Sequence, residues 1–122
     1  MEEFIPSEYE EQATFVEFLE LKGIKFSAVP NSTYTTSWQA KRDNYVLGLR
    51  KGMPDLIILI KKEQSKIGIP CLVFVEMKRL KRSKTSPEQK EWIEEFNKIA
   101  NIEAKVCFGA SEAINYISEF II

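Results

Sequence analysis

The chain has 122 residues, 44% of them apolar and 29% charged, which is typical of one globular domain spanning residues 1–122. The absence of histidine excludes mechanisms that need an imidazole base and removes the commonest zinc ligand. No apolar stretch reaches the roughly 20 residues that cross a bilayer, and the acidic N-terminus lacks the basic flank of a signal peptide, so we expect a cytoplasmic protein without a membrane partner.

The net charge of −1 conceals a segregation of charges along the chain. Residues 1–21 contain seven Glu and no Lys or Arg, whereas basic residues crowd into residues 78–84. Further basic pairs occur at Lys41-Arg42 and Arg50-Lys51. This distribution predicts a basic face suited to a polyanion, although each pair taken alone is equally consistent with solvated loop charges.

The first predicted helix covers residues 7–22. Ser7 is a suitable N-cap, acidic residues fill the first turn, and Gly23 ends the pattern. The apolar stripe of this helix is assigned to Tyr9, Ala13, Val16 and Leu19, widened by Phe15 and Phe18. A short strand is expected at residues 26–29, before Pro30.

A second helix is predicted over residues 38–47, and two strands over residues 56–60 and 71–78. The first strand is continuous and β-branched, as in a strand buried on both faces. The connection between the strands is too short for a crossover helix, so we expect them to pair antiparallel.

The sequence Ser86-Pro87-Glu88-Gln89 predicts the start of a third helix. Serine is a good N-cap, proline fits the first helical position, and glutamine three residues after serine completes a capping box. Its apolar stripe is assigned to Trp92, Ile93, Phe96 and Ala100. A strand at 104–108 and a helix after Gly109 complete an α/β pattern.

The residues that indicate a catalytic function lie at the ends of two predicted strands. Asp55 precedes one strand, and Glu76 and Lys78 lie near the end of the next, on the same face because side chains alternate along a strand. If the strands pair, two carboxylates and an ammonium group converge. Carboxylate oxygens favour Mg²⁺ or Mn²⁺, and such a set can hydrolyse a phosphodiester. The alternatives are an Asx-turn role for Asp55 and a solvated pair at a strand end.

The chain resembles the PD-(D/E)XK nuclease superfamily, and within it the VRR-NUC domain, over roughly residues 8–120. Pro54-Asp55 resembles the PD element and Glu76-Met77-Lys78 the E-X-K element. The resemblance extends to Gly52-Met53-Pro54-Asp55-Leu56, to Ser86-Pro87-Glu88-Gln89 with Trp92, and to Val29-Pro30-Asn31. It implies a restriction-endonuclease-like core, a small mixed β-sheet flanked by helices, and metal-dependent cleavage of DNA.

The resemblance also implies roles for further residues. The backbone carbonyl of Met77 is an expected metal ligand, and Gln89 is expected beside Lys78 as a positioning residue as well as a helix cap. The superfamily often adds a glutamate from the first helix. Among Glu8, Glu10 and Glu11 we favour Glu11, with Glu10 as the alternative.

The predicted DNA contacts are basic residues: Arg79, Lys81, Arg82, Lys84, Lys41, Arg42, Arg50 and Lys51. They can follow phosphates without reading bases, and no segment resembles a base-reading recognition helix. Together with the resemblance, this favours branched DNA and cutting like that of a Holliday junction resolvase, in a bacterial or phage-infected cell. A junction is two-fold symmetric, so a homodimer is expected. Tyr34, Trp38 and Tyr45 are candidates for its interface, and equally for the core.

Two other functions remain open. One is a catalytically idle module on the same fold that binds nucleic acid or a partner protein, although an idle module has no need for Asp55, Glu76 and Lys78 together. The other is an RNA-directed or flap-directed nuclease, because no motif reads or rejects a 2′-hydroxyl.

Overall fold

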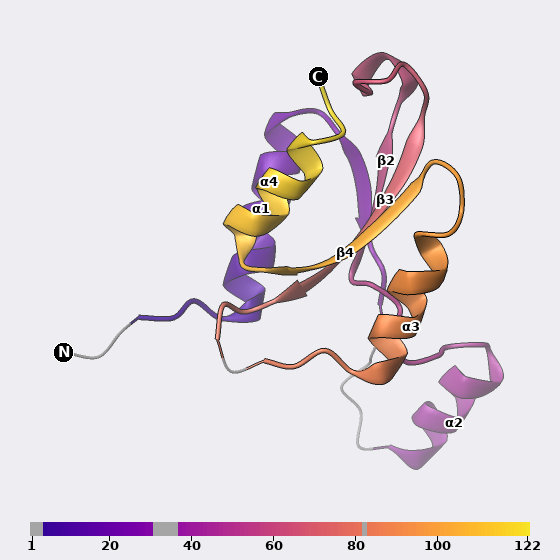
Figure 1. Ribbon diagram of the computed structural model, residues 1–122. Coiled ribbons are helices and arrows are strands. Elements are labelled where there is room, and N and C mark those ends of the chain that lie inside the picture. The colour runs from indigo at the N-terminus through magenta and orange to yellow at the C-terminus, as the bar shows by residue number, and fades with distance from the viewer. Residues whose placement is uncertain (1–3, 31–36, 82) are drawn as a thin grey trace.

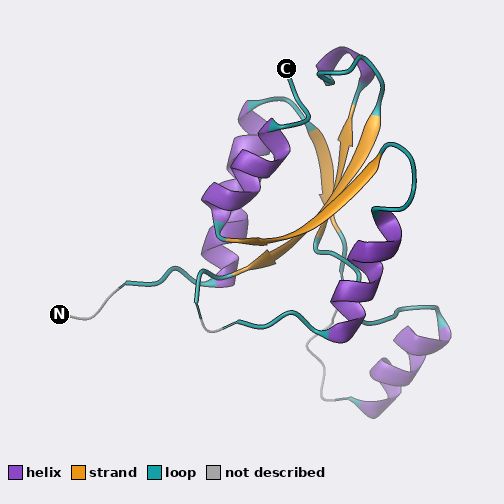
Figure 2. Ribbon diagram, in the orientation of Figure 1, coloured by secondary structure: helices purple, strands orange, loops and turns teal. Residues whose placement is uncertain are grey.

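The computed structural model describes residues 4–30, 37–81 and 83–122, and there it shows helices on both faces of a mixed four-stranded sheet (Figures 1 and 2). The elements in chain order are α1 (Glu8–Leu21), β1 (Lys25–Ala28), α2 (Trp38–Val46), β2 (Leu56–Ile60), the 3₁₀ turn η1 (Lys62–Gln64), β3 (Cys71–Lys78), α3 (Pro87–Phe96), β4 (Ile102–Phe108) and α4 (Ala110–Ser118). The predicted fold class is confirmed.

The sheet has the strand order β1-β2-β3-β4. β1, β2 and β3 pair antiparallel, and β3 pairs parallel with β4. The predicted antiparallel pairing of β2 with β3 is confirmed, with Leu56 opposite Val75. The parallel pair needs a crossover, and α3 provides it.

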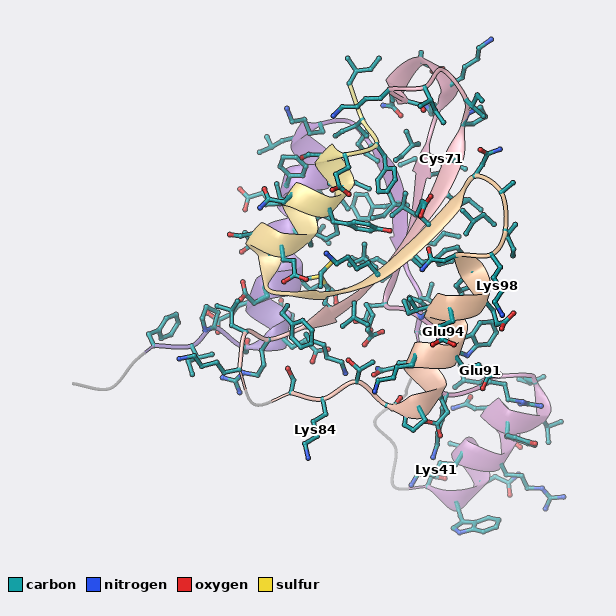
Figure 3. All side chains as sticks on the ribbon, viewed as in Figure 1. Lys41, Cys71, Lys84, Glu91, Glu94 and Lys98 are labelled. Carbon is teal, nitrogen blue, oxygen red and sulfur yellow. The ribbon has the colours of Figure 1, made fainter. Side chains whose placement is uncertain are left out.

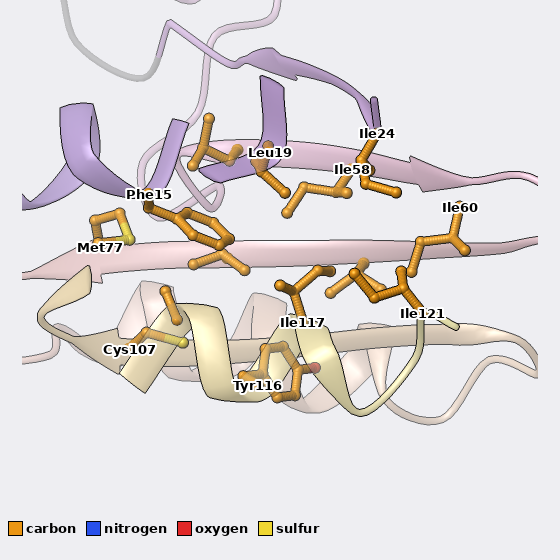
Figure 4. Packing of buried hydrophobic residues seen from close by; sticks show 14 of the residues in the cluster. Phe15, Leu19, Ile24, Ile58, Ile60, Met77, Cys107, Tyr116, Ile117 and Ile121 are labelled. Carbon is orange, nitrogen blue, oxygen red and sulfur yellow. The ribbon is translucent and has the colours of Figure 1, made fainter. Parts of the chain in front are cut away.

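The main core lies between the sheet and the helices α1 and α4, which lie side by side on one face (Figure 1). Phe15 and Leu19 of α1 meet Ile58 of β2 and Met77 of β3, and Ile117 of α4 closes the cluster (Figure 4). Each of these side chains is fully buried. The alternation along β3 therefore sends Met77 into the core and leaves Glu76 on the other face.

The opposite face of the sheet is covered by α3. The ring of Phe74 in β3 stacks on that of Phe96, with centroids 4.1 Å apart, and Trp92 stacks on Phe96 at 5.6 Å. Glu76 and Lys78 alternate in phase with Phe74, so they share the face that α3 covers. This face carries the polar chemistry, and the other face carries the bulk of the core.

The predicted apolar stripe of α1 is wrong at its N-terminal half. Tyr9 is 82% exposed, and the buried residues of the helix are Glu11, Phe15 and Leu19. These three positions repeat every four residues, so a carboxylate occupies the place where the pattern requires an apolar residue. One oxygen of the buried Glu11 accepts a hydrogen bond from a backbone N–H of α4, described below.

The third helix is shorter than predicted, because it ends at Phe96 and leaves Ala100 in an exposed turn. Asn97 ends it by exchanging two hydrogen bonds with the backbone of Ala104, at 2.8 and 2.9 Å, which turns the chain into β4. β4 accordingly begins at Ile102, two residues before the predicted start. No helix within the described residues is both long and apolar enough to cross a membrane.

Gly52 holds the N-terminal end of α3 against the loop that leads to Asp55. Its φ is +94°, and a Cβ atom there would lie 2.6 Å from the carbonyl carbon of Glu88 and 2.8 Å from the backbone nitrogen of Gln89. Only glycine permits both the conformation and this approach.

We expect Gly52→Ala to destabilise the protein by about 2 kcal/mol more than Gly48→Ala. Gly48 also has a positive φ, +103°, but nothing lies within 4 Å of its Cβ position. Comparing the two variants thus separates the destabilisation caused by the close approach to α3 from that caused by backbone strain alone. Urea denaturation of both variants measures the difference, and equal losses would show that the contact with α3 is unimportant.

Candidate active site

Three carboxylates from three separate elements converge at one edge of the sheet. Glu8 is the first residue of α1, Asp55 precedes β2, and Glu76 lies near the end of β3. One oxygen from each lies within 4.8 Å of the other two. The pairing of Leu56 with Val75 explains the approach of Asp55 to Glu76. In an antiparallel pair, the residue before Leu56 lies opposite the residue after Val75.

Hydrogen bonds fix two of these carboxylates. Asp55 Oδ2 accepts a hydrogen bond of 2.8 Å from the backbone N–H of Met77, which ties the loop before β2 to β3. Glu76 Oε2 accepts a bond of 2.9 Å from the side-chain amide of Gln89. Lys78 Nζ lies 3.7 Å from the same Glu76 oxygen. The structure therefore brings the predicted residues Asp55, Glu76, Lys78 and Gln89 together.

Glu76 is buried next to two other carboxylates, those of Asp55 and Glu8. Its residue is 3% exposed, and its Oε1 atom is buried without a hydrogen-bond partner. Burial, followed by the charges of Asp55 and Glu8, raises the pKa of Glu76 to about 8, although Lys78 opposes the shift. Burial and Asp55 also raise the pKa of Glu8.

This arrangement fits a hard divalent cation. The cluster offers carboxylate oxygens, which Mg²⁺ and Mn²⁺ prefer, and one of them is a buried acceptor that no protein group satisfies. A cation at this point would also offset the repulsion among Glu8, Asp55 and Glu76. Three carboxylates, one of them with a buried oxygen that accepts no hydrogen bond, are therefore a ligand set that fits such a cation.

The glutamate that α1 brings to the cluster is Glu8 rather than Glu11 or Glu10. Glu11 Oε1 accepts a hydrogen bond of 3.2 Å from the backbone N–H of Ala110 and so caps α4. Glu10 completes a capping box with Ser7. Two sequence signals were available: Glu11 is in phase with the buried Phe15, and Ser7 followed three residues later by Glu10 matches the box.

Gln89 makes two contacts through different side-chain atoms: the predicted helix cap, and a hydrogen bond to Glu76 where a place beside Lys78 is predicted. Its side-chain oxygen accepts a bond of 2.9 Å from the backbone N–H of Ser86, which completes the capping box of α3. Its side-chain nitrogen donates to Glu76. The amide thus contacts the buried carboxylate, and the N-terminus of α3 positions it.

We expect Gln89→Glu to reduce any metal-dependent activity about 10- to 100-fold and to lower the stability of the metal-free protein, because it places a further carboxylate next to the buried Glu76. A carboxylate can still accept the bond from Ser86, but it cannot donate to Glu76. Gln89→Ala is the companion variant, because it loses both the cap and the donor without adding a charge. Activity assays and thermal unfolding of both variants test the separation. Equal activity of Gln89→Glu and the parent would contradict a role for the amide donor.

The predicted DNA-contacting residues fall into two groups. Lys41, Arg42, Lys51, Lys81 and Lys84 are exposed, and Figure 3 shows Lys41 and Lys84 at the same lower edge of the molecule. The N-terminal ends of α1 and α3, which supply Glu8 and Gln89, lie along this edge too (Figure 1). Arg82 lies outside the described residues.

Two predicted phosphate-binding arginines instead contact the protein. Arg79 is half-buried and donates a hydrogen bond of 3.3 Å to the carbonyl of Ile5, just ahead of Glu8. Arg50 lies 3.8 Å from the ring centroid of Tyr45 and donates to the carbonyls of Tyr45 and Leu49 at 2.8 and 3.0 Å. Arg79 thus anchors the segment that carries Glu8, and Arg50 braces the end of α2.

The aromatic side chains considered for a dimer interface are on the surface wherever the structure describes them. Trp38 is 81% exposed and Tyr45 is 62% exposed. Tyr34 lies outside the described residues. A core role is thereby excluded for Trp38 and Tyr45.

Two comparisons with known proteins found matches. The model of the VRR-NUC domain family matches residues 3–111. A solved structure described as "VRR_NUC domain protein" superposes with a TM-score of 0.69 at 24% sequence identity, covering 96% of this chain and 89% of that one. A comparison with curated protein sequences found no match.

Proposed function

Because this chain belongs to the VRR-NUC domain family of nucleases, we propose that it is a divalent-metal-dependent DNA endonuclease that prefers branched DNA. The observation that carries the proposal is the convergence of Glu8, Asp55 and Glu76, with the buried Glu76 Oε1 atom lacking a partner. Family membership supports nuclease activity and DNA binding, and the acidic cluster supports the metal.

Glu8, Asp55 and Glu76 would hold Mg²⁺ or Mn²⁺, with the backbone carbonyl of Met77 as a further ligand. When bound, such an ion supplies a water of lowered pKa and neutralises negative charge on the scissile phosphate.

The protein's own groups hold this site in shape and supply positive charge. Asp55 is fixed by the N–H of Met77, and Glu76 by the amide of Gln89. Lys78 is 12% exposed and carries its ammonium group beside the carboxylates, where it can bind a phosphate oxygen or orient the attacking water. A fixed cation in a nearly dry site stabilises developing charge far more than one in bulk water.

The preference for branched DNA, as in Holliday junction resolution, is supported by the distribution of basic residues. The exposed Lys41, Arg42, Lys81 and Lys84 can contact phosphates at the edge that carries the carboxylates, and they offer no set of base-reading side chains. Symmetric cutting of a four-way junction needs two active sites related by a two-fold axis, so the proposal includes a homodimer.

The test uses a labelled four-way junction and the matching linear duplex, each incubated with Mg²⁺, Mn²⁺ or EDTA, beside the variant Asp55→Asn. Paired symmetric nicks in the junction that require both metal and Asp55 would support the whole proposal. Cutting of both substrates would retain the nuclease and remove the branch preference. Binding without cutting, in every metal, would favour the idle binding module or an RNA substrate, which a labelled RNA stem-loop then tests.

A further inference from the structure

Helix α2 projects from the rest of the fold and buries none of its own residues (Figure 1). The segment that follows the helix connects it to the rest of the chain. There Arg50 stacks on Tyr45, and the indole N–H of Trp92 donates a bond of 3.1 Å to the carbonyl of Lys51. We call residues 37–52 the α2 arm. A helix with no buried face is not explained by the core, so its exposed residues need another role.

One face of the arm combines aromatic and basic side chains. Trp38, Lys41, Arg42 and Tyr45 are spaced three, four and seven residues apart, which places them within about 100° of arc around the helix. The single acid of the helix, Asp43, points elsewhere and is bonded by Gln39 at 3.0 Å. The face thus presents a freely exposed indole between two cations.

We propose that the α2 arm binds DNA at a branch point, with Trp38 stacking on an unpaired base and Lys41 and Arg42 contacting the adjacent phosphates. This inference rests on the proposed DNA-cleaving function. Bases within a duplex are already stacked and cannot accept an indole, whereas a gap or a flap at a branch exposes unpaired bases. The arm therefore supplies a preference for branched over continuous duplex DNA that phosphate contacts alone cannot supply.

The charge of the α2 arm favours DNA over a second copy of the chain as its binding partner. The arm carries four basic residues and one acidic residue, in a chain whose net charge is −1. In a two-fold interface the same face meets itself, so the basic residues of one copy would lie against the basic face of the other. A polyanion such as DNA is attracted by the same charges, and its bases can stack on the aromatic ring.

The arm also leads directly to the carboxylate cluster. Gly52 at its end lies against the backbone of Glu88 and Gln89, and Asp55 follows three residues later. DNA held by the arm is therefore held next to the loop that carries Asp55. Lys41 lies at the same lower edge of the molecule as Lys84 of the loop after β3 (Figure 3).

The test measures binding to a flap-bearing duplex and to a fully paired blunt linear duplex, with Ca²⁺ replacing Mg²⁺ so that DNA is not cut. We expect Trp38→Ala to weaken flap binding about 5- to 100-fold, the range for loss of one stacked base, and to change binding of the linear duplex less than about twofold. Lys41→Ala should weaken both and reduce the salt slope by about one. Leu47→Ala is the matched control, because Leu47 is an equally exposed apolar residue, 85% accessible, at the C-terminal end of α2.

Fluorescence provides a second readout, because the chain has two tryptophans. In Trp92→Phe, flap DNA should quench the emission of Trp38, and in Trp38→Phe it should leave Trp92 little changed. Equal weakening of both substrates by Trp38→Ala, or none, would overturn the inference while cleavage by the parent protein persists. Loss of self-association in Trp38→Ala without loss of flap binding would assign the face to a second copy. Failure of the parent to bind any DNA would instead overturn the proposed function itself.

Discussion

Asp55→Asn is expected to lower metal-dependent DNA cleavage by at least about 1,000-fold, since the loss of one carboxylate ligand removes several kcal/mol of transition-state stabilisation. The same variant should be as stable as the parent without metal, or more stable. The substitution removes one of three negative charges whose oxygens lie within 4.8 Å, and an amide oxygen can still accept the hydrogen bond from Met77.

The two readouts together separate a functional site from a structural one. Cleavage of a labelled junction measures activity, and thermal unfolding in EDTA measures stability. Glu17→Gln removes an exposed carboxylate elsewhere on α1 and should change neither quantity. Undiminished cleavage by Asp55→Asn would remove Asp55 from the site, and a large loss of stability would mean that its role is structural.

Raising the pH from about 5 to about 9 should reduce the unfolding free energy of the metal-free protein by on the order of 3 kcal/mol through Glu76. Folding raises the pKa of this carboxyl from 4.5 to about 8, because the folded site is buried and already negative. A group with a raised pKa contributes stability that is complete below its unfolded pKa. That contribution is lost as the pH rises through its folded pKa. The raised pKa of Glu8 acts in the same direction.

Urea denaturation in EDTA across this pH range measures the effect. Glu76→Gln should flatten the pH profile, because the amide does not titrate. Mg²⁺ added at high pH should restore stability to the parent and not to this variant, because ligand binding to the folded state is stabilising. An identical pH slope in Glu76→Gln and the parent would assign the titration to another group.

Local signals were sufficient to predict most of the helices and strands and the convergence of Asp55, Glu76 and Lys78, whereas the overall fold was predicted from the family resemblance. The β-branched run of β2 and the capping box before α3 depend on neighbouring residues alone, and both elements lie where they were expected. The period of two along β3 places Glu76 and Lys78 on one face without knowledge of the tertiary structure. The antiparallel pairing of β2 with β3 then brings Asp55 to them.

The partners of individual charged side chains could not be predicted, because they come from distant parts of the chain. Glu11 Oε1 accepts a hydrogen bond from a backbone N–H 99 residues away, and Arg79 donates one to a carbonyl 74 residues away. A buried acid within an apolar stripe needs such a donor, and no local pattern shows which distant residue provides it. The sequence therefore favours Glu11 as the third carboxylate, whereas Glu8 is the glutamate that joins Asp55 and Glu76 in the cluster.

The two-sided use of β3 has a consequence for how the chain can change in length. Val73, Val75 and Met77 fill the core, while Phe74, Glu76 and Lys78 face α3 and the site. Adding or deleting one residue inside the strand moves the side chains beyond that point to the opposite face of the sheet. Carboxylate and ammonium groups would then enter the core, and apolar side chains would take their places in the site. Length variation among natural or engineered versions should therefore be absent within Cys71–Lys78, and concentrate in the exposed connections on either side.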